Sequence, residues 1–248
     1  MAFDLSSITK GGPQRPPLTV IHGGPGMGKT TFAAHAPSPV IMPIEQGLGD
    51  LTVDAFPQPE TLDEVMEGIA SLYEEGHGFE TLALDSLSAL EPLIWRKVAQ
   101  DHNVTSIEDL GFGKGYVYAM DYWRELVAAT MGLAKRGITP ILIAHSEIIK
   151  FDAPDTDAYD RYQIKLHKRA FQHLYEQADV IGFSHEPVYV SKENTKDTKG
   201  KAKPKGERQL RLVESPAVIA KNRYSMPETV PLDWDAFAAH VPYFNRNK

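Results

Sequence analysis

The stretch Gly23-Gly-Pro-Gly-Met-Gly28-Lys29-Thr30 fits the pattern G-x-x-x-x-G-K-[ST] of a phosphate-binding loop. It follows the short apolar run 18–22, which predicts a β-strand, and it leads into residues 29–36, which predict a helix ended by Pro37. Glycines let the backbone curl so that successive N–H groups point at phosphate oxygens, and the positive end of the helix adds to that field. This context favours a phosphate site over the alternative, a glycine-rich turn before a helix.

The side chains of this loop predict a nucleotide site with a metal ion. Lys29 is expected to reach the β- and γ-phosphates, and the Thr30 hydroxyl to complete a Mg²⁺ shell. ATP and Mg²⁺ are therefore the predicted cofactors. The predicted nucleotide-binding residues are Gly24, Pro25, Gly26, Met27, Gly28, Lys29, Thr30 and Thr31.

Apolar runs and helical patterns alternate along the rest of the chain. Strands alternating with helices, and made of near-continuous apolar runs, indicate an α/β fold with a mainly parallel sheet covered on both faces. A C-terminal β-hairpin, formed by residues 188–190 and 209–213, is also predicted. The further predicted strands are residues 40–44, 81–85, 140–144 and 180–183, and the further predicted helices are residues 61–75, 92–102, 116–136 and 166–178.

Size and composition set limits on the domain organisation. With 248 residues, 42% of them hydrophobic, we expect an N-terminal extension at 1–17 and one domain at 18–248. The chain has no cysteine, which excludes disulfides, thiolate zinc sites and a catalytic thiol. No apolar stretch approaches the roughly 18 residues of a membrane span, and the first residues do not resemble a secretion signal. We therefore expect a cytoplasmic protein.

The charge pattern singles out one basic segment in an acidic chain. The net charge of -7 argues against coating of nucleic acid by bulk electrostatics, so any contact with DNA must be local. The expected tip of the C-terminal hairpin, residues 191–208, has seven basic and three acidic residues and so a net charge of +4. A DNA-binding arm and a solvated hairpin tip explain this segment about equally well.

Three polar residues stand at the ends of predicted strands, where open parallel sheets bind ligands. Asp85 is predicted to hold Mg²⁺ together with Thr30, and its alternative role is to cap the helix that follows. Glu45 is a candidate to polarise the attacking water, or else one of many solvated glutamates. His145 could hydrogen-bond the γ-phosphate or simply finish its strand. The residues alone leave these alternatives open.

Taken together, these residues resemble the core of the RecA family. The order is the phosphate loop, then Glu45 in Ile-Glu-Gln-Gly, then Asp85 in Leu-Asp-Ser-Leu, then His145 in Ile-Ala-His. Other short motifs, spread over nearly the whole chain, are similar to those of phage-encoded, minimal RecA-like proteins linked to single-strand annealing. These motifs are Ser7-Ile-Thr-Lys-Gly11, Pro92-Leu-Ile-Trp95, Gly111-Phe-Gly-Lys-Gly115, Tyr159-Asp-Arg-Tyr162, Lys165-Leu-His-Lys168 and Lys221-Asn-Arg-Tyr224.

The resemblance implies a RecA-like P-loop fold with the strand order 5-1-4-3-2, counting the predicted strands along the chain. In that order His145 faces the γ-phosphate, and Glu45 is the catalytic carboxylate. The resemblance also implies that Lys221 and Arg223, after the apolar strand 218–220, reach the γ-phosphate of a neighbouring subunit. Glu45, His145, Lys221 and Arg223 are thus the predicted catalytic residues.

In RecA-like proteins the segments that leave the third and fourth strands face DNA, which here implies residues 103–116 and 146–165. Aromatic rings in these segments could stack on bases and cations could follow phosphates, although surface loops commonly carry tyrosine and lysine without such a role. The predicted DNA-binding residues are Phe112, Lys114, Tyr116, Lys150, Arg161, Tyr162 and Lys165, with Tyr159 as a further stacking candidate.

These expectations combine into a RecA-like ATPase that assembles head to tail on single-stranded DNA, is stimulated by it, and promotes annealing or recombination of phage DNA. The expected partners are single-stranded DNA, further copies of the chain and a single-strand-binding protein, with no membrane. The location would then be the cytoplasm of a bacterial host. Two other functions remain open: a helicase-like or loader ATPase, and a small-molecule P-loop kinase that uses the lysine-rich segment as a lid.

Overall fold

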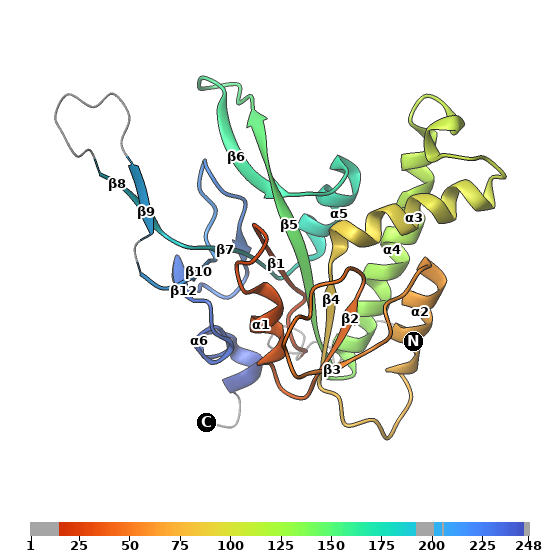
Figure 1. Cartoon of the computed structure of the whole chain (residues 1–248), viewed down its shortest axis with the longest axis horizontal. Helices are drawn as coiled ribbons and strands as arrows, with labels where there is room; N and C mark the ends of the chain where they lie inside the picture. Colours follow the sequence, from red (N-terminus) through yellow and green to blue (C-terminus); the bar gives the residue numbers. More distant parts are fainter. Residues whose placement is uncertain (1–14, 192–200, 205, 246–248) are drawn as a thin grey trace, which may run out of the picture.

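The central sheet is mixed, with a parallel middle and antiparallel strands at one side (Figure 1). The computed structural model describes residues 15–191, 201–204 and 206–245. Along the sheet the order is β12-β10-β7-β1-β5-β4-β2-β3, with β6 paired to β5 and β11 paired to β7. The strands are β1 (Thr19–Gly23), β2 (Pro39–Pro43), β3 (Asp54–Ala55), β4 (Thr81–Asp85), β5 (Thr139–Phe151), β6 (Tyr159–Ile164), β7 (Val180–His185), β8 (Val188–Ser191), β9 (Lys201–Pro204), β10 (Gln209–Arg211), β11 (Lys221–Asn222) and β12 (Thr229–Pro231).

The five strands predicted for the parallel sheet lie in the predicted order 5-1-4-3-2, as β7, β1, β5, β4 and β2. Their register aligns Gly23 with His145 and Asp85 with Ile143. The carboxyl ends of these strands therefore meet at one edge, which is where an open α/β sheet binds ligands. The predicted fold class is confirmed.

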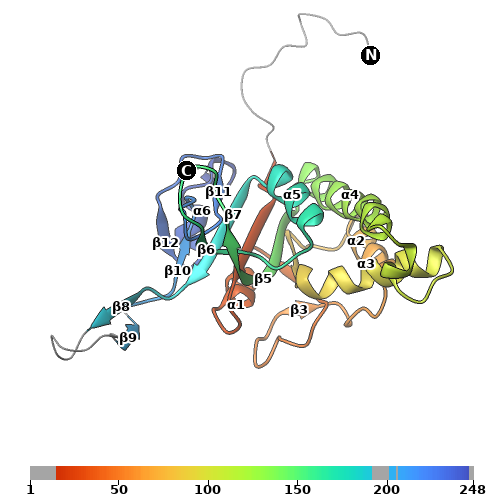
Figure 2. The same ribbon diagram turned by 90° about the horizontal axis from the view of Figure 1, so that it is seen from above.

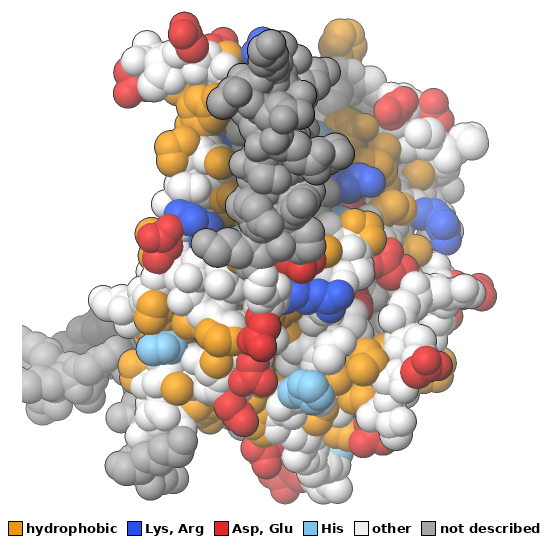
Figure 3. Space-filling view, turned by 60° about the vertical axis from the view of Figure 1, so that its left-hand side comes forward, with side chains coloured by type: hydrophobic (Ala, Val, Ile, Leu, Met, Phe, Trp, Pro, Cys, Tyr) orange, Lys and Arg blue, Asp and Glu red, His pale blue; other side chains and the backbone are white. Residues whose placement is uncertain are grey.

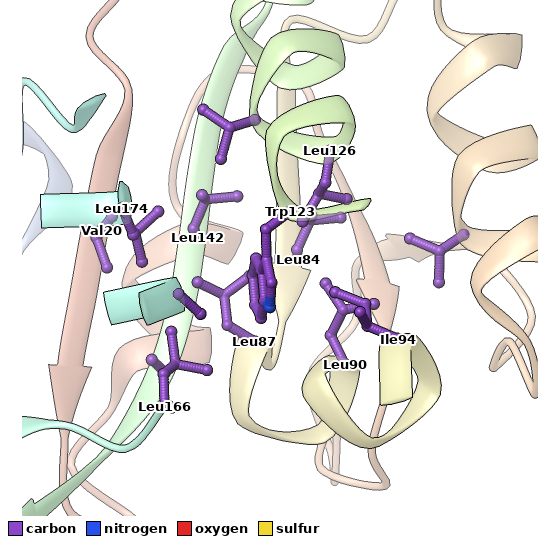
Figure 4. Close-up of a cluster of buried hydrophobic side chains, with 14 of the residues drawn as sticks. Val20, Leu84, Leu87, Leu90, Ile94, Trp123, Leu126, Leu142, Leu166 and Leu174 are labelled. Carbon is purple, nitrogen blue, oxygen red and sulfur yellow. The ribbon is translucent and has the colours of Figure 1, made fainter. Parts of the chain in front are cut away.

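Helices cover both faces of the sheet (Figure 2). One apolar cluster joins one face of the strands to α2, α3, α4 and α5, and a second joins the opposite face to α1 and α6. Trp123 lies fully buried in the first cluster, among Leu84, Leu87 and Leu142 (Figure 4). The helices are α1 (Lys29–Ala34), α2 (Leu62–Ser71), α3 (Leu87–Asp101), α4 (Lys114–Lys135), α5 (Lys168–Gln177) and α6 (Trp234–Ala238), with 3-10 turns η2 (Ile107–Leu110) and η3 (Pro242–Asn245).

Side-chain caps fix where two of these helices begin. The Thr61 side chain accepts a hydrogen bond from the Glu64 backbone N–H and starts α2, as its sequence predicts. The Ser86 side chain accepts from Ala89 and starts α3, which leaves Pro92 inside the helix rather than near its beginning. The predicted start of this helix near Pro92 is therefore wrong by about a turn, because the serine cap comes earlier.

The segment after His145, for which no strand was predicted, is a β-hairpin. Strand β5 continues to Phe151 and pairs antiparallel with β6, in a register that places Ile148 opposite Tyr162 and Lys150 opposite Asp160. Mixed polar and apolar residues suit a ribbon that stands out from the sheet with both faces partly solvated.

The predicted C-terminal hairpin pairs the wrong strands. Strand β8 pairs with β9, and the two form a separate arm that stands away from the rest of the molecule (Figures 1 and 2). Strand β10 pairs instead with β7 and β12. Leu210 of β10 lies against Gly182, and a side chain at Gly182 would collide with it, so the glycine makes room for this pairing. The lysine-rich tip lies largely outside the described residues, at 192–200 and 205.

No helix within the described residues is long and apolar enough to cross a membrane.

His22 of β1 is a buried, neutral histidine that links three parts of the fold. Its Nε2 lies 2.8 Å from the Ile219 carbonyl oxygen and its Nδ1 lies 2.8 Å from the Ser146 hydroxyl oxygen. A carbonyl can only accept, so Nε2 carries the proton and Nδ1 accepts from the hydroxyl. The pKa of His22 is lowered from 6.5 to about 4, mainly by burial and to a smaller extent by the nearby Lys29, while the hydrogen bond to Ile219 opposes the shift.

Acidification is expected to destabilise the fold partly through His22. The unfolded state takes up a proton near pH 6.5 and the folded state only near pH 4, so stability is present above pH 6.5 and is lost between these values. Urea unfolding at pH 7.5 and pH 5 should show that His22→Gln removes about 2 kcal/mol of the pH-dependent loss. The exposed His240→Gln is the matched control, and equal pH dependence of both variants would contradict the assignment.

Candidate nucleotide-binding site

A cavity of about 430 Å³ opens at the carboxyl edge of the parallel strands, above β1. It brings together the phosphate loop and all three candidate residues at the strand ends. Its size suits a nucleotide, since small-molecule pockets commonly measure about 300 to 1,000 Å³. The lining residues are Pro25, Gly26, Met27, Gly28, Lys29, Thr30, Thr31, Glu45, Gln46, Gly47, Leu48, Leu51, Asp85, His145 and Arg208.

The phosphate loop takes its shape from glycines. Gly26 and Gly28 have φ angles of 70° and 86°, in the left-handed region that favours glycine. A side chain at Gly23 would collide with the Ser184 carbonyl oxygen, so this glycine lets the loop start tight against β7. The Ser184 hydroxyl also donates a 3.0 Å hydrogen bond to the Met27 carbonyl and ties the loop to that strand. Gly24, the first predicted contact, lies beside the cavity rather than in its lining.

Lys29 is held inside the loop by backbone carbonyls. Its Nζ donates to the carbonyl oxygens of Gly23 at 3.1 Å and Gly24 at 2.8 Å. Burial lowers its pKa, and the carboxylates of Asp85 and Glu45 oppose that shift. The ammonium is thus poorly hydrated, and its attraction for phosphate oxygens is stronger there than in bulk water.

Thr30 and Asp85 form the predicted metal pair. The Thr30 hydroxyl donates a 2.6 Å hydrogen bond to the Asp85 carboxylate. Burial raises the pKa of Asp85, while the Thr30 hydrogen bond lowers it. Two hard oxygen donors side by side fit Mg²⁺, which prefers oxygen ligands. The alternative role of Asp85 as a helix cap is excluded, because Ser86 caps α3.

Glu45 and His145 meet across the cavity. They are separated by 100 residues in sequence, yet His145 Nε2 lies 2.8 Å from Glu45 Oε1. The Glu45 backbone is tied to β4, since its N–H and that of Ile44 both donate to the Asp85 carbonyl. The His145 backbone N–H donates to the Ser88 hydroxyl at 3.1 Å. A carboxylate and an imidazole are thereby fixed at the side of the loop where the γ-phosphate is expected.

Lys221 and Arg223 lie away from this cavity. Strand β11 pairs Lys221 with Ile181 and Asn222 with Val180, at the amino end of β7. Lys221 Nζ donates to the Tyr175 and Glu176 carbonyls, at 2.6 and 3.1 Å. Its burial lowers its pKa. These cations cannot act on the phosphate site of their own chain in this arrangement, and only a neighbouring chain could use them.

The predicted strand before these two residues is wrong. Residues 218–220 make isolated bridges and hydrogen bonds, and the strand that follows is the short β11. Arg223 pairs with Asp179 at 3.1 Å, and half of its side chain is exposed. Asp179 also pairs with Arg15 at 2.7 Å.

The predicted DNA contacts between α3 and α4 form an exposed tip (Figure 1). Phe112 is fully exposed, and its φ angle of 48° places it in the left-handed region between two glycines that are also left-handed. Lys114 at the start of α4 is exposed. One face of the Tyr116 ring is covered, because it stacks on His167 at a centroid distance of 4.3 Å. The left-handed backbone of Phe112 costs about 1 kcal/mol or more, because the residue is not a glycine.

The predicted DNA contacts on the β5–β6 hairpin differ in how far they are exposed. Lys150, Tyr162 and Lys165 are exposed, and Tyr159 is half-buried against Phe151. Figure 3 shows acidic side chains at the end of this hairpin, where the sequence places Asp152, Asp155, Asp157 and Asp160. DNA phosphates would be repelled there.

Arg161, a predicted phosphate contact, is buried and forms an ion pair with Glu214. Its guanidinium already has a partner, and a buried cation that loses its partner is strongly destabilising. We therefore leave Arg161 out of the candidate DNA surface.

Arg208 lines the nucleotide cavity and was not predicted as a site residue. In the sequence it falls at the end of the lysine-rich segment 191–208, although it directly precedes β10, a strand with a buried leucine at its centre. That position next to a strand of the sheet, rather than within the low-complexity run, is the signal that could have separated it.

A family model described as "AAA domain" matches residues 15–224. The flagellar accessory protein FlaH from Methanocaldococcus jannaschii is a solved structure with a TM-score of 0.47 and 12% identity, over 89% of this chain and 86% of that chain. No curated protein matches. The family match covers most of the chain and includes the phosphate loop, so the protein belongs to the AAA domain family and carries a P-loop ATPase domain.

Proposed function

We propose that this protein is an ATP-hydrolysing, RecA-like protein that assembles head to tail on single-stranded DNA and promotes annealing or recombination of phage DNA. The observation that carries the proposal is the 2.8 Å contact between Glu45 and His145 beside the phosphate loop, because His145 belongs to β5, the strand that continues into the β5–β6 hairpin. His145 and the surface hairpin thus share one strand.

For hydrolysis, Glu45 is the base in this proposal. It takes a proton from a water molecule as the water oxygen bonds to the γ-phosphorus, and the bond from that phosphorus to the β–γ bridging oxygen breaks. Lys29 stabilises the negative charge that develops on the phosphates of the leaving ADP. Thr30 and Asp85 are the residues that would hold Mg²⁺, which neutralises phosphate charge when bound. His145 holds the Glu45 carboxylate in place through its Nε2.

For the coupling of DNA binding to hydrolysis, His145 connects the nucleotide site to the β5–β6 hairpin. Its backbone carbonyl accepts a 2.9 Å hydrogen bond from the N–H of Lys165, just after β6. The exposed face of the hairpin carries Ile148 opposite Tyr162, and both are well exposed. Binding of bases against this face would change the position of β5, and with it the His145–Glu45 contact. This supports stimulation of hydrolysis by single-stranded DNA, since a ligand acts on a distant site only through an element that both sites bias.

For assembly, the position of Arg223 favours sharing of sites between chains. The residue lies at the sheet edge opposite the cavity and remains half exposed, so its guanidinium is accessible to a neighbour. An interface with a cavity on one side and a cation on the other is heterologous and propagates head to tail.

The test of this proposal is the release of inorganic phosphate from ATP, with and without single-stranded DNA, over a series of salt concentrations. We expect hydrolysis that rises with DNA and loses this stimulation as salt increases, since phosphate contacts release counterions. Phosphate transfer to a small molecule without release to water would identify a kinase instead. Hydrolysis coupled to unwinding of a forked duplex would identify a helicase.

Within that assay, Phe112→Ala is expected to weaken single-stranded DNA binding by about fivefold to a hundredfold. Stacking of a base on an aromatic ring is worth about 1 to 3 kcal/mol, and the slope against salt should stay the same because no cation is lost. Fluorescence anisotropy with a labelled oligonucleotide measures both quantities. Val213→Ala, which also shortens an exposed apolar side chain, is the control. Equal affinities of the two variants would rule out a stacking role.

A further inference from the structure

Arg208 is placed on the phosphate loop by the sheet itself. It stands directly before β10, whose Gln209 pairs with His185 of β7, and its carbonyl accepts a 3.0 Å hydrogen bond from Leu232. Strand β7 in turn pairs with β1, which leads into the phosphate loop. The backbone of Arg208 is therefore fixed at the carboxyl edge, on the side of β1 opposite Glu45.

The guanidinium of Arg208 approaches the loop where there is no side chain. A Cβ atom at Gly28 would lie 3.2 Å from Arg208 Nη1 and 3.2 Å from Leu232 Cδ2. Gly28 thus has two reasons to be glycine, its left-handed φ of 86° and this close approach. Among the described residues, none forms a hydrogen bond or an ion pair with the Arg208 side chain.

The charges that line the cavity favour a ligand for this arginine. Without Arg208, one ammonium, Lys29, faces two carboxylates, Glu45 and Asp85. Arg208 brings the lining to equal numbers of cations and carboxylates. A nucleoside triphosphate carries several negative charges, and an arginine whose N–H groups have no partner among the described residues is the residue type that binds phosphate oxygens in pairs.

We propose that Arg208 is a second phosphate-binding cation of this site, which holds the phosphate chain of ATP from the side of the loop opposite Glu45 and His145. The inference rests on the proposed nucleotide binding and adds a residue to it. It also gives the β8–β9 arm a connection to the nucleotide, because the arm lies between β7, which contacts the loop through Ser184, and Arg208. In this proposal, binding of the ATP phosphates by Arg208 would hold the chain in place where it leaves the arm.

The experiment measures affinity for fluorescent ATP, with competition by inorganic tripolyphosphate, for the parent protein and for Arg208→Ala. We expect affinity for both ligands to fall about tenfold, as for a lost charge-assisted hydrogen bond, and Arg208→Lys to recover part of it. The control is Arg169→Ala, which removes the same charge from an exposed position on α5. Thermal unfolding of each variant verifies that the fold is intact.

Three results would overturn the assignment. The first is unchanged affinity of Arg208→Ala for both ligands, when the parent binds ATP and Lys29→Ala does not. The second is a loss for ATP but not for tripolyphosphate, which would place Arg208 against the nucleoside. The third is an equal loss in Arg169→Ala, which would reduce the effect to overall charge. A parent protein that binds neither ligand would instead contradict the proposed function.

Discussion

Glu45→Gln is expected to bind ATP as the parent does and to hydrolyse it about a hundred to ten thousand times more slowly. The amide keeps the size of the side chain and can still accept the 2.8 Å hydrogen bond from His145, so the cavity stays intact. It cannot take a proton from water, and loss of a general base costs rates of that order. Phosphate release and binding of fluorescent ATP, measured on the same preparation, separate the two effects.

Two further variants serve as references for this result, one expected to lose ATP binding and one expected to match the parent. Lys29→Ala should lose ATP binding itself, because the ammonium inside the loop is the main cation facing the phosphates. Glu67→Gln, an exposed glutamate of α2 away from the nucleotide cavity, should match the parent in both measurements. If Glu45→Gln hydrolyses ATP at the parent rate, the base is another residue and the proposed mechanism is wrong.

Most residues of the candidate nucleotide site lie in short local patterns, so the sequence alone could single them out. The phosphate loop needs closely spaced glycines, and each of the buried parallel strands is an apolar run with a polar residue at or just after its end, as at Asp85. The contact between Glu45 and His145, by contrast, does not follow from a local pattern. Nothing local encodes a contact across 100 residues, and only the strand order, implied by the resemblance, brought these two strand ends to one edge.

Pairing of short strands is where prediction from sequence fails. The runs before and after the lysine-rich segment both have strand character, and adjacency along the chain favoured pairing them with each other. The structure pairs β10 with β7, because Gly182 leaves room for Leu210. Complementarity of this kind depends on a residue about 28 positions away, so periodicity within either run cannot reveal it. The same limit hid Arg208, whose place in the lining of the cavity depends on the pairing of β10 with β7 and not on its neighbours in sequence.

Mixing two inactive variants is expected to restore ATP hydrolysis, if Arg223 acts on the ATP of a neighbouring chain. Arg223→Ala keeps an intact phosphate site, whereas Lys29→Ala keeps an intact arginine. Alone, each should be slower by about a thousandfold or more, as for loss of an arginine finger or of the phosphate-binding lysine. With random assembly of equal amounts, about one quarter of the head-to-tail interfaces would join the intact site of one variant to the intact arginine of the other.

The structure makes this a test of function rather than of folding. Arg223 contacts Asp179, but that carboxylate also binds Arg15 at 2.7 Å and the backbone N–H of Leu18 at 2.9 Å, so Arg223→Ala leaves no unpaired buried charge. A purely structural role for Arg223 gives no rescue, because the chain that lacks it stays impaired whatever its neighbour carries. A finger that acts within its own chain gives none either, since no chain in the mixture holds both parts. Activity no higher than the average of the two variants, once exchange of chains is verified, would therefore remove the shared site and the head-to-tail interface built on it.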